Sequence, residues 1–256
     1  MSGIFGPTGF PTLDRLSAFV ETYRSRMDNK NNNLFAFSAG AWWTYYIFLT
    51  HILARYDRSN AEYGEVMEPV TRRMSEAPAG GRSRPMTPED MAEWKRQIDL
   101  ATVLHLDIET FYLFAKILLD RIADTFGFMF GVDWKSSGSS HSDLSKRFET
   151  LCRDKGLEIR PDNLPALISK LSKAVVDYRN KLIEHLNDPR ILKGTASAPG
   201  KASSIVTSHM YPTEEDAEAF RQTEDPHALL RMLEEYIEAM LKLFEVNTKK
   251  SPLIVS

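Results

Sequence analysis

The sequence predicts an all-α fold, an up-and-down bundle of helices. Apolar residues recur every three or four positions along most of the chain, which is the period of an amphipathic α-helix. The longest segment with this period runs from residue 88 to residue 130 and contains no internal proline. Segments rich in glycine, serine and proline separate the periodic stretches, as loops do.

The composition is that of an ordinary globular protein. The chain has 256 residues, enough for a sizeable core, and we treat it as a single domain. Its formal net charge of −3 supplies no overall positive field, so any nucleic acid has to be held by a local patch. The single Cys152 excludes an internal disulfide and fits a reducing compartment. No signal peptide is visible at the N-terminus, and we expect a cytoplasmic protein.

Residues 1–87 are predicted to form an N-terminal helical extension. Pro11 opens a first helix, and residues 28–33 are a polar, asparagine-rich break. An aromatic segment follows, and we expect it to be helical from about residue 35 to about residue 56. Its lack of a polar face indicates that other helices surround it.

The aromatic segment also has the length of a membrane span. Residues 34–53 contain no Lys, Arg, Asp or Glu, and twenty such residues can cross a bilayer. Trp42, Trp43, Tyr45 and Tyr46 lie in the middle of the segment, however, whereas membrane proteins place such residues at the ends of a span. We therefore predict a buried core helix and keep a membrane span as the alternative.

The bundle proper is predicted to cover residues 88–247. After a loop rich in proline and glycine, Thr87-Pro88-Glu89-Asp90 has the residue types of a helix start. Residues 88–130 then form one very long helix or two in line, with an apolar surface wide enough for the interior of a bundle. One of its acids is a candidate partner for Arg179, although ordinary helix ion pairs are the alternative. The acids considered are Asp107, Glu109, Asp120 and Asp124.

The second half of the bundle has shorter elements. Residues 131–142 are a serine-rich loop, in which His141 either approaches a substrate or faces solvent. A short helix follows at residues 143–153. Residues 191–212 form a loop rich in glycine, serine and proline, with a β-like run at residues 204–207. The final helix starts after Asp225-Pro226, and residues 248–256 are a flexible tail or an edge contact.

The stretch most informative about function is the predicted helix of residues 164–186. Arg179 and His185 flank its apolar stripe, about 120° apart and about 9 Å apart along the axis. Side chains so placed line a groove beside a packed partner, but they are poorly placed to meet on one atom from a single helix. If they act together, we expect a second copy of the helix to complete the site.

The string Arg179-Asn180, four residues and then His185 resembles the signature of the HEPN superfamily (higher eukaryotes and prokaryotes nucleotide-binding). The wording of residues 178–185, Tyr-Arg-Asn-Lys-Leu-Ile-Glu-His, is similar to that of many members. The resemblance covers this helix most strongly and the long helix of residues 88–130 by its general character. It implies a HEPN-like bundle, to which residues 1–87 and 191–212 are additions.

The resemblance also implies an activity: metal-independent endoribonuclease action in a groove shared by two protomers. Histidine suits proton transfer near neutral pH, and arginine offers a fixed fork of donors to phosphate. The implied catalytic residues are Arg179, Asn180 and His185, and Lys181 is a candidate substrate contact. No metal or cofactor is expected. RNA, a second copy of the chain and an antitoxin or regulatory protein are the expected partners, since family members include toxins and phage-defence proteins.

Two alternatives to the ribonuclease remain open. The chain can instead be a non-catalytic helical module, in which the same polar groups grip a nucleotide or a protein partner. A third possibility is a protein anchored in a membrane through residues 34–53. The sequence contains no phosphate-binding glycine loop, no HExxH and no zinc-ligand spacing, so it gives no support to those chemistries.

Overall fold

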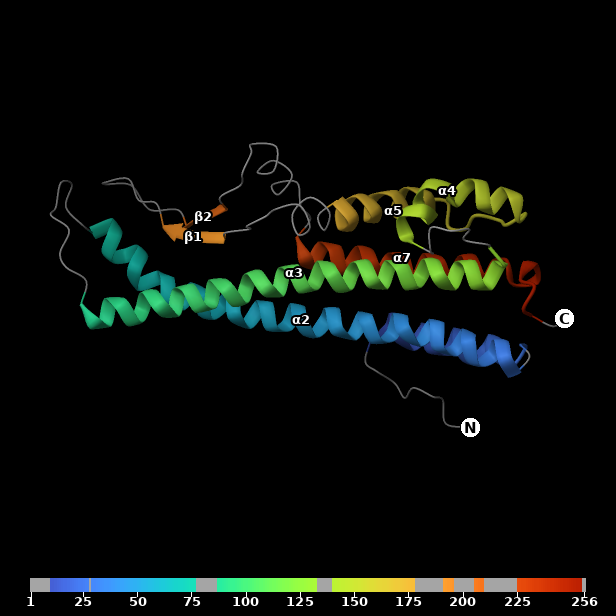
Figure 1. The fold of residues 1–256 in the computed structure, drawn as a ribbon, viewed down its shortest axis with the longest axis horizontal. Coiled ribbons are helices and arrows are strands. Elements are labelled where there is room, and N and C mark those ends of the chain that lie inside the picture. Colours follow the sequence, from blue (N-terminus) through green and yellow to red (C-terminus); the bar gives the residue numbers. More distant parts are fainter. Residues whose placement is uncertain are drawn as a thin grey trace. The chain divides into compact units, whose positions relative to one another are not determined.

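The computed structural model describes residues 10–27, 29–76, 87–132, 140–177, 191–195, 205–209 and 225–254. Most of these residues are helical, which confirms the predicted all-α class, and a single two-stranded hairpin accompanies the helices in the described part of the chain. Figure 1 shows the elements, which are α1 (Pro11–Arg24), α2 (Asn29–Glu76), α3 (Pro88–Phe130), α4 (His141–Asp154), α5 (Leu164–Leu171), the π-helical η1 (Ser172–Asp177), β1 (Ile191–Thr195), β2 (Ile205–His209), α7 (Pro226–Val246) and the 3-10 turn η3 (Thr248–Lys250).

Helix α3 forms as one helix with the predicted start. The backbone N–H of Asp90 donates to Thr87 Oγ1 at 3.2 Å, and the N–H of Thr87 donates to the Asp90 carboxylate at 2.9 Å. This reciprocal pair satisfies backbone donors that a helix start leaves without an intrahelical partner. Pro88 occupies the first helical position, where its missing N–H costs nothing.

Helix α2 is longer than predicted at both ends. It begins at Asn29, inside the expected polar break, because Asn32 bonds to the end of α1. Its side-chain oxygen accepts from Arg24 Nε at 2.9 Å, and its amide nitrogen donates to the Arg24 carbonyl at 2.9 Å. The helix then continues to Glu76 with Pro69 inside it.

The chain forms two compact units, and α2 and α3 each contribute to both. Unit 1 comprises residues 1–50, 112–177 and 224–256, and unit 2 comprises residues 51–111 and 178–223. The single domain of the sequence prediction stays a prediction.

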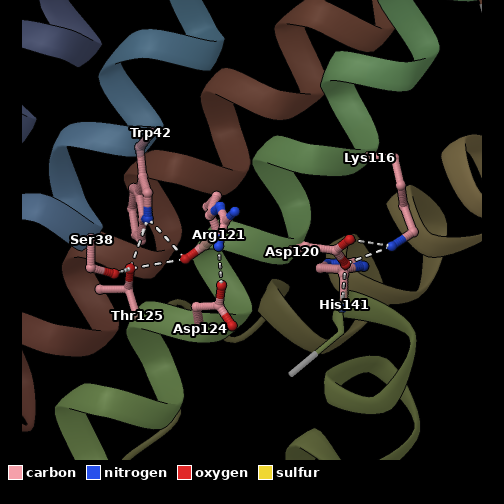
Figure 2. Close-up of polar contacts among 8 residues, drawn as sticks. All are labelled: Ser38, Trp42, Lys116, Asp120, Arg121, Asp124, Thr125 and His141. Atoms are coloured by element: carbon pink, nitrogen blue, oxygen red, sulfur yellow. Dashed lines mark hydrogen bonds and ion pairs between the residues drawn. The ribbon is translucent and has the colours of Figure 1, made fainter. Parts of the chain in front are cut away.

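Unit 1 has an aromatic core. Trp42, Tyr46 and Phe244 are almost completely buried, as the prediction of a core helix requires. The Trp42 indole N–H donates to Thr125 Oγ1 at 2.9 Å, and that hydroxyl also contacts Ser38 Oγ at 2.5 Å (Figure 2). The indole therefore keeps a hydrogen-bond partner inside the core. Among the described helices, none combines the length and the apolarity that a bilayer crossing needs.

The end of α7 is also tied into unit 1. The buried Asn247 accepts from the Glu158 N–H at 2.7 Å and donates to the carbonyls of Glu158 at 2.7 Å and Leu243 at 2.9 Å. Ser251 is buried, and its hydroxyl donates to the Met129 carbonyl at 2.6 Å. The sequence left a flexible tail and an edge contact as alternatives. Residues 248–254 make the edge contact.

Unit 2 has a smaller apolar cluster and an ion pair. Its buried members are Tyr63, Met67, Ala101 and Leu104. The buried Asp107 accepts a hydrogen bond from Arg55 Nε at 2.8 Å and forms an ion pair with the same guanidinium. The hairpin of β1 and β2 also belongs to unit 2. Its strands are antiparallel, with Ile191 opposite His209, so the described residues 205–207 of the predicted β-like run lie in a strand.

Candidate functional site

The predicted site residues lie outside the described residues. Arg179, Asn180, Lys181 and His185 all fall within residues 178–190, so their geometry stays a prediction. The structure does describe the helix that leads to them and the elements that hold this helix in unit 1.

Helix α5 is fixed by its apolar face. Leu164, Leu167, Ile168 and Leu171 are buried, and the helix packs against α4 and α7. Asn163 precedes it, and Pro165 lies in its first turn. Each buried leucine or isoleucine stabilises the packing by about 1.5–3 kcal/mol, so α5 has a defined position against its neighbours.

A π-helical segment replaces the predicted α-helix at residues 172–177. The prediction of one continuous α-helix from residue 164 to residue 186 is therefore wrong over these six residues. A π-helix bonds residue i to i+5, so each residue turns through less than the 100° of an α-helix. Val175 is nevertheless fully buried, and η1 packs against α4. The position of Arg179 beside the apolar stripe, which lies outside the described residues, therefore stays a prediction, and the six-residue separation of Arg179 and His185 in the sequence is unaffected.

Helix α4 begins at His141, two residues before the predicted start. Ser140 caps it, since its hydroxyl accepts from the Asp143 N–H at 3.1 Å and donates to the Asp143 carboxylate at 2.7 Å. His141 is fully buried, so neither its predicted solvent-facing position nor an approach to substrate is correct. The serines around His141 have the composition of a loop, and for that reason the Ser-x-x-Asp helix start was not predicted.

A buried polar cluster from α3 and α4 lies beside this cap. Lys116 Nζ contacts the two carboxylate oxygens of Asp120 at 2.6 and 2.5 Å (Figure 2). Asp120 also accepts from the backbone N–H of His141 at 2.9 Å. The carboxylate thus lies at the positive end of the α4 dipole and neutralises a nearly buried ammonium, which ties the start of α4 to α3.

Among the described residues, the imidazole of His141 has no hydrogen-bond partner for either ring nitrogen. It packs edge-on against Tyr236 of α7, with ring centroids 5.4 Å apart, and the buried Tyr236 hydroxyl likewise has no partner in the described part of the chain. Burial, together with the smaller effect of the Lys116 charge, lowers the pKa of His141 to about 3. A neutral ring without access to solvent does not exchange protons with a substrate near neutral pH, so this cluster positions α4 and is not a catalytic centre.

The acids of α3 have local partners. In unit 1, Asp120 pairs with Lys116 and Asp124 pairs with Arg121 at 2.9 Å. The other two acids belong to unit 2, where Asp107 pairs with Arg55 and Glu109 lies 2.9 Å from His105 Nε2. Pairs within the helix, the alternative given by the sequence, are formed by Asp120 and Asp124, whereas the buried Asp107 pairs with Arg55 of α2. Contact of one of these acids with Arg179 stays a prediction, because Arg179 lies outside the described residues.

An open groove of about 730 Å³ lies in unit 1, lined by residues of α1, α7 and the segment before α5. Its charged lining residues are three cations and three acids, namely Arg15, Arg231, Lys242, Glu234, Glu235 and Glu238. Arg15 forms an ion pair with Glu238, and the Tyr46 hydroxyl donates to Glu234. Because the charges balance, the groove does not favour a phosphate. In the described part of the chain, no three residues among His, Cys, Asp and Glu come together as metal ligands.

Comparisons of the chain with models of protein families, with curated proteins and with solved structures give no match.

Proposed function

We propose that the protein is a metal-independent endoribonuclease of the HEPN type, with a composite site formed by two copies of the chain. The observation that carries the proposal is the string Arg179-Asn180-x4-His185, which follows a helix packed into an all-helical unit. The described residues support the proposal through that helix: α5 is held by α4 and α7, and a π segment, a feature frequent near functional sites, lies between it and the string.

The chemistry assigns one role to each residue type. Cleavage proceeds by attack of the RNA 2′-hydroxyl on the adjacent phosphate, so it needs a base for that hydroxyl and an acid for the leaving 5′-oxygen. The His185 side chains of two protomers supply both. Arg179 stabilises the charge on the crowded phosphate through its fork of donors, and Asn180 orients the reacting groups. Lys181 binds a neighbouring phosphate as a point charge.

The test is RNA cleavage by the purified full-length chain in the presence of EDTA. We expect His185→Ala to lower the rate by about 10²–10⁴-fold, the usual contribution of a general acid or base. Arg179→Ala lowers it by at least about 10²-fold, because a developing negative charge loses its donor. Lys181→Ala raises KM with little effect on kcat.

Matched controls remove a similar group elsewhere. Lys173→Ala removes an exposed cation from η1, and His51→Ala removes an exposed imidazole. Both variants should cleave at the wild-type rate. If wild type, His185→Ala and Arg179→Ala behave alike, with or without cleavage, the ribonuclease proposal is wrong. Nucleotide binding without cleavage, lost in Arg179→Ala, supports the non-catalytic module.

A further inference from the structure

Unit 1 exposes apolar side chains along one side of α2. Phe37 is 82% exposed, Leu34 47% and Phe48 42%. With Ala41 and Tyr45, which are half-buried, they fall within about 80° of one another around the helix axis. We call these five residues the α2 stripe. It lies beside the buried face that carries Phe35, Trp42 and Leu49 and is separate from it.

The surface continues from the α2 stripe onto α3. The rings of Tyr45 and Phe48 lie 5.9 and 5.3 Å from the ring of Phe114, measured between centroids. Phe114 itself is half-buried. The apolar surface therefore extends from the α2 stripe to the Phe114 ring of α3 within unit 1.

The charge of the α2 stripe restricts the kind of partner. The segment from Leu34 to Leu53 contains no Lys, Arg, Asp or Glu. A nucleic acid is held by basic residues, which this surface lacks. The buried core of a protein interface, in contrast, is depleted in charge and enriched in aromatic residues. The surface therefore has the chemistry of a protein interface.

The spacing of the stripe identifies which protein fits. The residues 34, 37, 41, 45 and 48 are separated by three, four, four and three positions, so the order is the same read from either end. A two-fold axis through Ala41 would pair each position with its mirror position on an antiparallel copy of α2. Such reciprocity is the requirement of an isologous interface, in which residue i contacts j and j contacts i.

We propose that the α2 stripe is the interface of a homodimer, in which α2 packs antiparallel on α2 of a second copy and crosses it at Ala41. Leu34 then packs on Phe48 of the copy, and Phe37 packs on Tyr45 of the copy. Ala41 is small enough for the two helices to approach closely at the crossing. Beside it, the space that a Cβ on Gly40 would occupy has no atom within 4 Å.

The exposed area is of the size that a dimer needs. The exposed parts of Phe37, Phe48 and Leu34 amount to about 350 Å² of apolar surface. A homodimer interface of standard size buries about 800 Å² per subunit, of which about 500 Å² is apolar. The half-buried members Ala41, Tyr45 and Phe114 supply the difference. The inference rests on this surface alone and does not require the ribonuclease proposal.

The test uses charge at the crossing point, measured on the full-length chain by light scattering after size exclusion. Wild type should have twice the 29.2 kDa mass of the chain. In Ala41→Glu or Ala41→Arg, two like charges meet on the axis, so the dimer dissociation constant should rise at least about 10²-fold. An equimolar mixture of the two variants brings opposite charges together and should restore the dimer.

Controls separate the interface from general effects of charge. Thr150→Glu and Thr150→Arg place the same charges at an exposed position of α4, and both should remain dimeric. Circular dichroism checks that each variant is folded. A monomeric wild type overturns the proposal, whether the stripe then contacts another part of the same chain or a different partner. So does a dimer that tolerates both Ala41 variants, or a mixture that stays monomeric although each variant is folded.

Discussion

The ring of His141 is fully buried beside Tyr236 of α7, and the start of its own helix lies against Lys116 and Asp120 of α3. Burial lowers its pKa from 6.5 to about 3, and the Lys116 ammonium acts in the same direction. Because the folded-state pKa is the lower one, the unfolded chain binds the additional proton between pH 6.5 and about pH 3. The stability that depends on the neutral ring is therefore complete above pH 6.5 and is lost as the pH falls toward 3.

This linkage gives a prediction about a single side chain. Between pH 7 and pH 5 the proton uptake at His141 should lower the free energy of unfolding by about 2 kcal/mol, since the slope approaches about 1.4 kcal/mol per pH unit. His141→Phe keeps a ring against Tyr236 and cannot titrate, so urea unfolding at the two pH values should show a drop smaller by that amount. The exposed His51, changed to Phe, is the control. An unchanged drop in His141→Phe would show that other groups cause the acid dependence.

The sequence could not predict the burial of His141, because its neighbours Ser139, Ser140 and Ser142 have the composition of a loop. Burial of this ring depends on Tyr236, almost a hundred residues later in the chain, and local periodicity does not contain that contact. The motif residues Arg179 and His185 present the opposite case. The chemistry proposed for them comes from residue type and from the resemblance of their spacing to the HEPN signature, and both that chemistry and their positions remain predictions.

Among the elements, α4 connects the polar cluster of α3 to α5. Its N-terminal hydrogen bonds go to Ser140 and Asp120, and its apolar face packs against α5 and η1. We expect Ser140→Ala to lower the free energy of unfolding by about 1 kcal/mol, the usual contribution of an N-cap. Chemical denaturation measures it directly.

The matched control for this helix cap is Ser142→Ala, which removes the same hydroxyl two residues later, after the cap. It should change the free energy of unfolding by less than about 0.5 kcal/mol. Equal effects of the two substitutions would mean that the hydroxyl of Ser140 contributes no capping energy. Hydrogen exchange of α4 adds a local measure, because loss of the cap should increase exchange first in the turn that begins at His141.

Helix boundaries were predictable where capping residues and apolar period agree. Thr87-Pro88 and Asp225-Pro226 start α3 and α7 as expected, because a capping oxygen and a proline with a fixed φ both favour that position. Helix α2 departs from the prediction because its polar start is stabilised by the tertiary bonds of Asn32 to Arg24. The π segment departs from it because the apolar spacing around Val175 is compatible with more than one helix type.

At the scale of the whole molecule, the two compact units are invisible in the sequence, since α2 and α3 run without interruption from one to the other. The long apolar period predicts the helices, but it does not show where contacts between distant residues become sparse. Oligomeric state is a property of the same scale. It connects the two proposals, because the composite ribonuclease site needs a second chain and the α2 stripe offers a surface for one.

The two proposals can be separated by measuring RNA cleavage against protein concentration. If the site is composite, the rate per chain should be constant above the dimer dissociation constant and should fall in proportion to concentration well below it, because only dimers cleave. Ala41→Glu should then show that fall at concentrations at least about 10²-fold higher, and its mixture with Ala41→Arg should recover the wild-type rate.

Each failure in this experiment points to one proposal. If monomeric Ala41→Glu cleaves at the wild-type rate per chain, the composite site is wrong while the α2 interface and ribonuclease activity stand. If the wild type is dimeric but cleaves no RNA, and Ala41→Glu is monomeric, the ribonuclease proposal is wrong and the proposal of the α2 interface stands. Cleavage that depends on concentration equally in wild type and in Ala41→Glu places the dimer on another face, where His185 of each chain can still supply the acid and the base.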